Sequence, residues 1–378
     1  MGLSVMVRAL LKSSQMKLVG TRILPFPFWA DNPYPNMLYL AARAAGAEIR
    51  GTTLLPSLLS ELAKARPGDV LHIHWTGPVC QAASTEADAV ARLESFSSAV
   101  IAAKSRGVAV VWTIHNTIPH DANFMEQELE LSRFLAEAAD LIHVMTAEAP
   151  QVVSEYYHLP PSKLRVIPHS SYQGIYGSHR TRAAAREHFG IRPDEKAVLF
   201  FGQMRPYKGL DTLLAAIEIA HSESTPIALL LAGKTSPDSL KEIDSRLPTS
   251  AHVIRDHSFI PDADVDLWFT AADVAVFPYR KILNSGSVNL ASTYAVPCIL
   301  PGEPHLRAQY AKEKWVNFYD RENEVDSLAA LLAQWQDDSG AQTRAARSAA
   351  AQYTPYQMST DFAQTLVELS VSIGSSVA

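Results

Sequence analysis

The chain has 378 residues, of which 47% are hydrophobic and 19% are charged, and its formal net charge is -6 at pH 7. A single hydrophobic core rarely grows beyond about 250–300 residues, so this length predicts two domains. The apolar fraction excludes a disordered chain. The acidic balance argues against a nucleic-acid-binding protein, although it permits one basic pocket.

The cysteines and the apolar runs indicate no metal site, redox site or membrane span. Cys80 and Cys298 match no zinc or redox spacing, so we expect two buried thiols in a reducing compartment. No run of about 20 apolar residues occurs, so no membrane-spanning helix is expected. Residues 1–16 hold two basic residues but no cleavage site, which argues against a secretory signal. We interpret them as a frayed extension before a second start near Met16, or as a weak amphipathic membrane contact.

Short β-branched runs alternate with longer helical patterns, which predicts parallel sheets with helices on both faces. In the first half we expect strands at 17–24, 47–53, 70–75, 109–115, 141–145 and 164–167, and helices at 36–45, 87–105 and 123–138. In the second half we expect strands at 197–201, 227–231, 252–255, 274–277 and 297–300, and helices at 210–221, 264–271, 288–294, 325–336, 341–352 and 354–369.

The alternation of strand and helix patterns restarts after an irregular stretch rich in Ser, Gly and Tyr, and this restart predicts a domain boundary. We expect one doubly wound α/β domain at 1–170, a linker at 171–190 and a second doubly wound domain at 191–354. The helical segment 355–378 is expected to pack back on the first domain. In open α/β sheets the ligand lies outside the carboxyl ends of the strands, so we expect a crevice between the domains to hold the site.

The first informative loop follows the expected strand at 197–201. The chain leaves that strand at Gly202, carries Arg205 and Lys208, and enters a helix near Leu210. The amides and dipole of a helix N-terminus favour anions, Arg can bind phosphate oxygens with its fork, and Lys adds a point charge. The loop therefore indicates a phosphate site, and its alternative reading is a solvated surface loop.

A second loop of this kind follows the expected strand at 274–277. Ser285, Gly286 and Ser287 open the next helix and offer hydroxyls, amides and close backbone approach. A row of small residues at a helix start is also typical of a plain N-cap. Two anion sites at strand ends of one domain nevertheless fit a diphosphate.

Both loops resemble parts of a known family. The run Phe-Gly-Gln-Met-Arg-Pro-Tyr-Lys-Gly-Leu at 201–210 resembles the donor-diphosphate loop of GT-B-fold glycosyltransferases of the family 4 type. The run Ala-Ala-Asp-Val-Ala-Val-Phe-Pro-Tyr at 271–279 resembles their later donor-binding loop. The stretch 294–299 lies where relatives usually read Gly-x-Pro-Val-Ile.

The first half is similar to a narrower group. The stretches 69–75, 112–120 and 166–170 resemble bacterial exopolysaccharide transferases, including the mannosyltransferases of xanthan-type assembly. This resemblance favours GDP-mannose as the donor, while UDP-sugars stay open. It implies a saccharide or lipid-linked saccharide acceptor, and hence a cytoplasmic protein that contacts the inner face of the cytoplasmic membrane.

The resemblance implies a GT-B fold, with two Rossmann-like domains facing across a cleft, and transfer of a sugar from a nucleotide sugar to an acceptor hydroxyl. It places the acceptor on the first domain and the donor on the second. The donor diphosphate is expected at Gly202, Arg205, Lys208, Ser285, Gly286 and Ser287. The nucleotide and its sugar are expected at Gly233, Lys234, Arg255, Phe259, Tyr279, Asn284 and Asn289.

One departure from the family concerns stereochemistry. Retaining relatives carry two glutamates eight residues apart, and the aligned positions here are Ile282 and Leu290. Both inversion and retention therefore stay open, and inversion would need a general base near the acceptor. The candidates for that base are His115, His120, Asp121 and Asp31, each of which has a structural alternative such as a helix cap or a satisfied core histidine.

The acceptor is expected along strand ends of the first domain. The aromatic loop at 26–36 supplies Trp29, Asn32 and Tyr34, and aromatic faces stack on sugar rings. His74 and His169 are further candidates for this surface. Packing of the loop on its own domain is the alternative reading.

No cofactor and no metal are expected. Arg205 and Lys208 supply the charge that a cation would supply, and the carboxylates at 262, 264 and 266 suit the first turn of a helix. No Gly-x-Gly-x-x-Gly follows the first expected strand, which disfavours an oxidoreductase. The alternatives to a glycosyltransferase are a nucleotide-sugar epimerase of the same fold and a catalytically inactive, nucleotide-sugar-binding relative.

Overall fold

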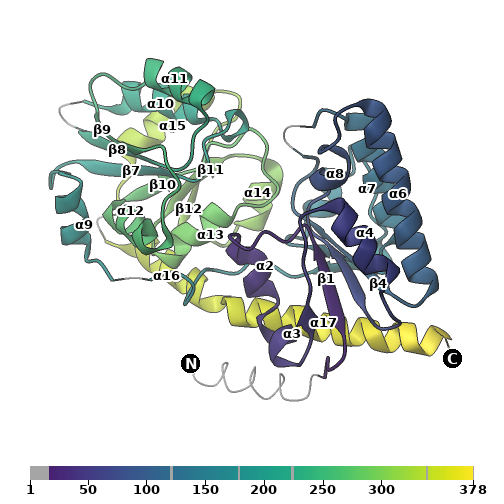
Figure 1. Cartoon of the computed structure of the whole chain (residues 1–378). Helices are drawn as coiled ribbons and strands as arrows, with labels where there is room; N and C mark the ends of the chain where they lie inside the picture. The colour runs from purple at the N-terminus through teal and green to yellow at the C-terminus, as the bar shows by residue number, and fades with distance from the viewer. Residues whose placement is uncertain (1–16, 120–121, 178, 223–224, 338, 378) are drawn as a thin grey trace. The chain divides into compact units, whose positions relative to one another are not determined.

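The computed structural model describes residues 17–377, apart from 120–121, 178, 223–224 and 338. The chain divides into two compact units, Met1–His169 with Pro355–Ala378, and Ser170–Thr354. Each unit is a six-stranded parallel sheet flanked by helices (Figure 1), which confirms the predicted α/β class. The segment 171–190, which we expected to be a linker, belongs to the second unit and contains a helix.

The sheet of the first unit has the strand order β2-β1-β3-β4-β5-β6, and all its pairs are parallel. Its strands are β1 (Arg22–Phe26), β2 (Glu48–Ile49), β3 (Val70–Ile73), β4 (Ala109–Ile114), β5 (Leu141–Val144) and β6 (Leu164–Val166). β1 begins later than the expected 17–24, because Gly20 adopts a positive φ of 86° in a turn. The order of the chain reverses between β1 and β3, which makes their carboxyl ends the switch point of this sheet.

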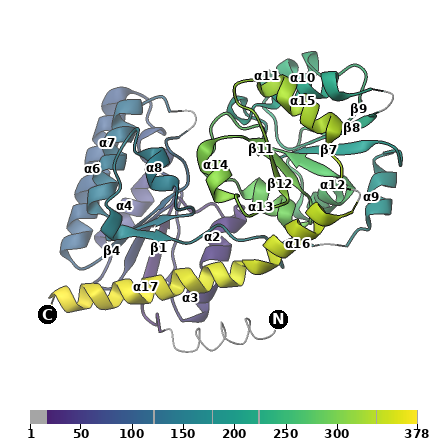
Figure 2. The same cartoon turned by 180° about the vertical axis from the view of Figure 1, so that it is seen from behind.

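The helices of the first unit are α2 (Pro33–Leu38), α3 (Leu40–Ala44), α4 (Leu55–Ala63), α5 (Gly77–Cys80), α6 (Glu86–Ser105), α7 (Met125–Ala138), α8 (Ala149–Val153) and α17 (Pro355–Val377). The N-cap of α6 is Thr85, whose side chain accepts a hydrogen bond from the amide of Asp88. α17 packs against α3, α2 and β4, and Figures 1 and 2 show it in yellow beside α3. The first unit therefore includes a helix from the far end of the sequence.

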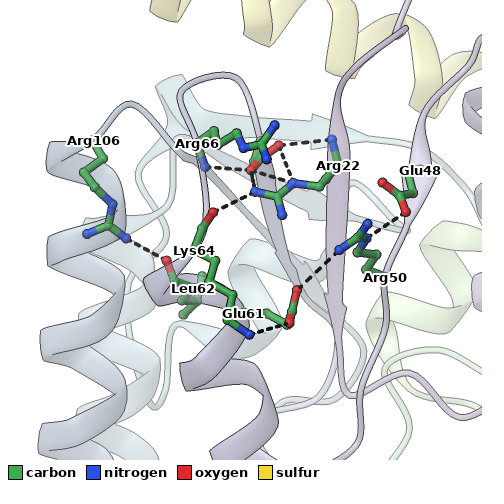
Figure 3. Close-up of polar contacts among 9 residues, drawn as sticks. Arg22, Glu48, Arg50, Glu61, Leu62, Lys64, Arg66 and Arg106 are labelled. Carbon is green, nitrogen blue, oxygen red and sulfur yellow. Dashed lines mark hydrogen bonds and ion pairs between the residues drawn. The ribbon is translucent and has the colours of Figure 1, made fainter.

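An ionic network holds the amino-terminal edge of the first sheet. The guanidinium of Arg22, at the start of β1, pairs with the buried carboxylate of Asp69, just before β3. The amide of Arg66 donates to the same carboxylate over 2.7 Å. Burial alone would raise the pKa of Asp69, but these hydrogen bonds outweigh it and hold the pKa below its usual value. Figure 3 shows the neighbouring pairs of Arg50 with Glu48 and Glu61.

The sheet of the second unit has the strand order β12-β11-β10-β7-β8-β9. Its strands are β7 (Lys196–Phe201), β8 (Ile227–Ala232), β9 (His252–Asp256), β10 (Val274–Val276), β11 (Cys298–Pro301) and β12 (Val316–Tyr319). Counted within the unit, this is the 3-2-1-4-5-6 order of dinucleotide-binding sheets. The switch point lies between β7 and β10, which pair in parallel.

The helices of the second unit are α9 (Arg182–His188), α10 (Leu210–Ala220), α11 (Pro237–Ser245), α12 (Val265–Ala271), α13 (Gly286–Thr293), α14 (Pro304–Gln309), α15 (Glu324–Gln334) and α16 (Ala341–Gln352), with 3-10 turns at Pro206–Lys208 and Asp262–Asp264. α10 packs on α15, and α12 packs on α9. The sequence pattern did not predict β12 or several short helices. Of these helices, α4, α5, α8, α11 and α14 carry proline in their first turn, where proline fits a helix but resembles a breaker in sequence.

Two smaller expectations can be compared with the structure. Cys80 and Cys298 are both buried free thiols, which confirms their expected burial, while the reducing compartment stays a prediction. Within the described residues, no helix combines the length and apolar character that crossing a membrane requires. The expected membrane contact at 1–16 lies outside the described residues.

Candidate functional site

The first part of the candidate site lies where β7 and β10 end, at the switch point of the second sheet. After β7 the chain passes Gly202 and forms the 3-10 turn Pro206–Lys208, and Gly209 then starts α10 with φ 65°. A Cβ on Gly209 would lie 2.0 Å from the carbonyl oxygen of Pro278, which follows β10. Only glycine therefore allows the loops after β7 and β10 to touch.

A third strand end joins these two loops. Gly233 follows β8 with φ 144°, and a Cβ there would lie 2.2 Å from the carbonyl oxygen of Gly202. The backbones after β7 and β8 are thus in direct contact. This close packing requires glycine at position 233, and the φ of 118° favours glycine at position 202.

A cation and a hydroxyl converge on Gly202 from opposite loops. The position of a Cβ on Gly202, which has φ 118°, lies 3.0 Å from Nζ of Lys208 and 3.4 Å from Oγ of Ser287. Lys208 Nζ also lies 5.2 Å from the centre of the Tyr279 ring. The structure therefore brings together Lys208 and Ser287, from the two loops that the sequence singled out for a diphosphate.

The start of α13 leaves donors beside this point. Ser285 is its N-cap but makes no side-chain cap hydrogen bond, and Gly286 is the first helical residue. The side chain of Asn289 donates to the carbonyl oxygen of Ser285 over 3.2 Å, which braces the loop. Tyr279 is buried, and its hydroxyl has no hydrogen-bond partner among the described residues. A polar ligand at Gly202 would meet a cation, hydroxyls and helix amides.

The other predicted donor residues lie at or after strand ends of the same sheet. Arg205 is exposed and lines a depression of about 80 Å³ formed with α10 and α11. The guanidinium of Arg255 pairs with Asp244 of α11. Lys234 is exposed, Phe259 is 63% exposed on the loop after β9, and Asn284 is half-buried before α13. Their roles in donor binding stay predictions.

The structure shows what replaces the two glutamates of retaining relatives. Leu290 is buried within α13, and Ile282 accepts a hydrogen bond from His305 through its carbonyl oxygen. Neither side chain can bind a hydroxyl. Ala295, at the position of the usual glycine, adopts φ 59°, a left-handed conformation that costs a residue with a Cβ about 1–2 kcal/mol.

The carboxylates at the start of α12 pair with one arginine. Arg180 pairs with both Asp264 and Asp266, and Asp266 also accepts the amide of His179 over 2.9 Å. Burial alone would raise the pKa of Asp266, but these hydrogen bonds hold it below its usual value. Among the described residues no cluster of His, Cys, Asp or Glu suits a metal ion. These carboxylates therefore fasten the segment before α9 to α12.

A larger cavity of the second unit, of about 830 Å³, lies at the opposite edge of the sheet. Its lining includes Lys196 at the start of β7 and Asp273 just before β10. Arg182 and Arg186 both pair with Asp273. The carboxylate of Asp273 is thus paired, and the cavity lies away from the carboxyl strand ends where doubly wound sheets bind ligands.

The second part of the candidate site is the switch point of the first sheet. Trp29, after β1, lies 4.9 Å from Trp75, after β3, between ring centroids. His115, after β4, stacks on Trp75 at 4.0 Å and 19°. Trp29 is 36% exposed, so this surface offers the aromatic faces that sugar rings stack on.

Tyr34 links three of the predicted histidines. Its ring centroid lies 4.9 Å from that of His169, 5.1 Å from that of His115 and 6.2 Å from that of His74. The structure thus gathers Tyr34 and these histidines within the first unit. Three predicted residues of the acceptor surface and one candidate base, from separate parts of the sequence, thus form one cluster.

Four other predicted residues lie elsewhere or are not described. Asn32 is the N-cap of α2, where its Oδ1 accepts the amide of Tyr34 over 3.0 Å, so it positions that residue. Asp31 is exposed beside it. His120 and Asp121 lie outside the described residues.

Three buried polar residues near these histidines, Tyr39, Thr113 and His143, were not predicted from the sequence. The hydroxyl of Tyr39 hydrogen-bonds to His72 and His74, and the hydroxyl of Thr113 bonds to His72 and to His143. The only sequence signal was a polar residue inside an apolar strand, Thr113 in β4 and His143 in β5. A buried polar group requires a partner, so this signal could have indicated a network but not its members.

Family comparisons cover both units. Residues 181–352 match the family described as glycosyl transferases group 1, and residues 81–170 match the family described as glycosyltransferase family 4. The solved structure of HepE from Anabaena in complex with UDP has the same fold, with a TM-score of 0.65 and 13% identity over 92% of this chain and all of that one. The chain belongs to the GT-B glycosyltransferases.

Curated relatives of this glycosyltransferase have two kinds of names. The GDP-mannose:glycolipid 4-beta-D-mannosyltransferase of Xanthomonas campestris is 24% identical over 308 residues, 80% of each chain. The D-inositol 3-phosphate glycosyltransferase of Segniliparus rotundus is 28% identical over 213 residues, 53% of this chain and 46% of that one. The comparisons therefore agree that the chain is a glycosyltransferase that uses a nucleotide sugar.

Proposed function

We propose that this glycosyltransferase moves a hexose, with mannose favoured, from a nucleoside-diphosphate sugar to a hydroxyl of a saccharide or lipid-linked saccharide in the assembly of a bacterial surface polysaccharide or glycolipid. The mannosyltransferase relative supports the sugar and the acceptor, since its name includes GDP-mannose and a glycolipid. A lipid-linked acceptor would bring the protein to a membrane surface.

The convergence of Lys208 and Ser287 on Gly202 carries the proposal. When the sugar leaves its donor, negative charge develops on the diphosphate. A preorganised cation and helix amides at that point lower the barrier by several kcal/mol. Because Lys208 supplies a positive charge at the switch point, we infer that no metal is required.

The residues at positions 282 and 290 favour an inverting reaction, for which a residue of the first unit would act as the base. Ile282 and Leu290 offer no carboxylate beside the donor sugar. His115, on the aromatic surface of the first unit, is the base we favour. Asp31 and the undescribed His120 and Asp121 are the alternatives.

Nucleotide binding tests the proposal before any acceptor is known. Titration calorimetry with GDP and with UDP should show binding of one of them to the full chain. Lys208→Ala should weaken that binding about tenfold or more, the usual worth of a charge-assisted hydrogen bond. The matched control Lys312→Ala, an exposed lysine before β12, should leave it unchanged. Absence of binding by both nucleotides would overturn the proposal.

Hydrolysis separates an enzyme from an inactive relative. GDP-mannose and UDP-glucose, incubated with the protein in water, should release nucleotide slowly, because water replaces the acceptor. Release that depends on Lys208 indicates a competent site. Tight nucleotide binding with no release, with or without bacterial glycolipid extract, would indicate a binding protein.

A further inference from the structure

A chain of hydrogen bonds runs through the middle of the first sheet. It starts at the backbone carbonyl oxygen of Ile167, which lies 2.8 Å from Nε2 of His143. Nδ1 of His143 lies 3.0 Å from Oγ1 of Thr113, and the same Oγ1 lies 2.7 Å from Nε2 of His72. The chain therefore crosses from β5 through β4 to β3.

Tyr39 continues the chain toward the carboxyl edge of the sheet. Its hydroxyl lies 2.6 Å from Nδ1 of His72 and 2.7 Å from Nε2 of His74. Nδ1 of His74 then lies 3.2 Å from Nε2 of His115. An unbroken series of six hydrogen bonds thus connects a backbone carbonyl to the residue that stacks on Trp75.

One end of this series determines the direction of every bond. A carbonyl oxygen only accepts, so Nε2 of His143 carries its proton and Nδ1 accepts, because a neutral imidazole has one N–H. Thr113 must donate its single hydroxyl proton to that Nδ1, and its oxygen then accepts from Nε2–H of His72.

The same rule fixes the second half of the series. Nδ1 of His72 has no proton, so Tyr39 donates to it and accepts from Nε2–H of His74. Nδ1 of His74 is then an acceptor, and its donor is Nε2–H of His115.

We propose that His143, Thr113, His72, Tyr39 and His74, which we call the relay, hold His115 with its proton on Nε2 and so make Nδ1 the nitrogen that takes the proton of the acceptor hydroxyl. The role in transfer depends on the proposed function, whereas the tautomers do not. The relay residues are positioning residues, since they act through His115.

Burial keeps the three histidines of the relay neutral, and a neutral imidazole has only one N–H. His72, His74 and His143 are at most 1% exposed. Burial lowers the pKa of His74 to about 3 and that of His143 to about 4, and it holds the pKa of His72 well below its usual range. Buried networks of this kind favour one arrangement strongly when every member is satisfied.

The transfer step balances with this assignment. The acceptor O–H bond breaks, its proton goes to Nδ1 of His115, and the oxygen forms a bond to the anomeric carbon. The bond from that carbon to the donor oxygen breaks, and the nucleoside diphosphate leaves with the electron pair. A base in the wrong tautomer presents N–H to the hydroxyl and cannot take its proton.

Nitrogen NMR of the full chain with ¹⁵N-labelled histidine tests the tautomers directly. At neutral pH His143, His72, His74 and His115 should each carry one proton, on Nε2, with assignments from single His→Gln variants. Finding any of the first three protonated on Nδ1, or on both nitrogens, overturns the relay. Finding His115 without a proton on Nε2 also overturns it.

Thr113→Val tests whether the protonation of His143 fixes the tautomers of the histidines further along the relay. Without the hydroxyl, His72, His74 and His115 should show both tautomers. Thr113→Ser should restore one tautomer. The control Thr360→Val removes another buried threonine hydroxyl of the first unit, one that bonds to Tyr356 of its own helix, and should change nothing. Unchanged tautomers in folded Thr113→Val would overturn the proposal.

Measurements of turnover distinguish a failure of the relay from a failure of the proposed function. In Thr113→Val kcat should fall at least about twofold with KM unchanged, because only part of the molecules hold the competent tautomer. Thr113→Ser and Thr360→Val should keep the kcat of the unmodified chain. Fixed tautomers in a chain that binds neither GDP nor UDP would contradict the proposed function alone. Normal kcat with mixed tautomers would contradict the relay alone.

Discussion

The ring of Phe362 stacks on the ring of His72, with 5.1 Å between the centroids and 20° between the planes. Phe362 also lies 5.9 Å from the ring of Tyr39 and 5.8 Å from that of His143. One phenyl group of α17 therefore contacts three members of the relay. This contact keeps water away from their hydrogen bonds.

Phe362→Ala should lower the free energy of unfolding by about 3–5 kcal/mol, because it removes a fully buried ring and leaves a cavity. Urea unfolding followed by circular dichroism measures this change. The control Val371→Ala, at a 64% exposed position of the same helix, should stay within about 0.5 kcal/mol. Similar losses in the two variants would contradict the packing of α17 described above.

Mild acid should destabilise the protein. In the unfolded chain His72, His74 and His143 bind protons below about pH 6.5, whereas in the folded chain they stay neutral to much lower pH. The unfolded state then binds more protons, so the free energy of unfolding falls as the pH falls. Each histidine contributes up to about 1.4 kcal/mol per pH unit.

The expected window runs from about pH 6.5 down to the folded pKa of His143, about 4. Urea midpoints measured at intervals across it should fall steadily. His143→Asn should reduce the slope, and His188→Gln, at an exposed position on α9, should not. A midpoint that stays constant from neutral pH into this window would exclude neutral buried histidines.

Gly233→Ala should destabilise the second unit by roughly 3 kcal/mol or more, because its Cβ would overlap the Gly202 carbonyl oxygen. Gly190→Ala is the matched control, since Gly190 also has a positive φ but nothing lies within 4 Å of its Cβ position. It should cost only about 1–2 kcal/mol. Thermal unfolding measures both, and equal costs would mean that the β7 and β8 loops do not touch.

Ala295→Gly should stabilise the protein by up to about 1 kcal/mol, because glycine adopts φ 59° without strain. Ala291→Gly, in the interior of α13, should instead destabilise it by about 1 kcal/mol or more. The two melting temperatures should therefore move in opposite directions. A loss of stability in both variants would show that Ala295 is not strained.

The positions of the two loops after β7 and β10 could be predicted from sequence because their signals are local. Gly202, Lys208, Gly209 and Ser287 each stand at a strand end or a helix start, and the alternation of strands and helices sets those ends on one edge of the sheet. What the sequence could not show is that Lys208 and Ser287 approach the same glycine. That distance depends on the contact between Gly209 and the Pro278 carbonyl oxygen.

The relay could not be predicted for a related reason. Thr113 meets His143 because these residues are direct partners in the register of β4 and β5. Register is a property of the strand pair, and neither strand's own pattern contains it. The contact of Tyr39 was harder still to predict. This residue lies outside the sheet, directly after a short helix that starts with proline.

The position of α17 in the sequence also affects the order in which the two units fold during synthesis. The core of the first unit includes Phe362, which leaves the ribosome almost two hundred residues after His169. At about 5–20 residues per second, that part waits roughly 10–40 s for its last helix. The second unit, continuous from Ser170 to Thr354, is complete earlier. During synthesis the half of the chain made first is thus the half that finishes folding last.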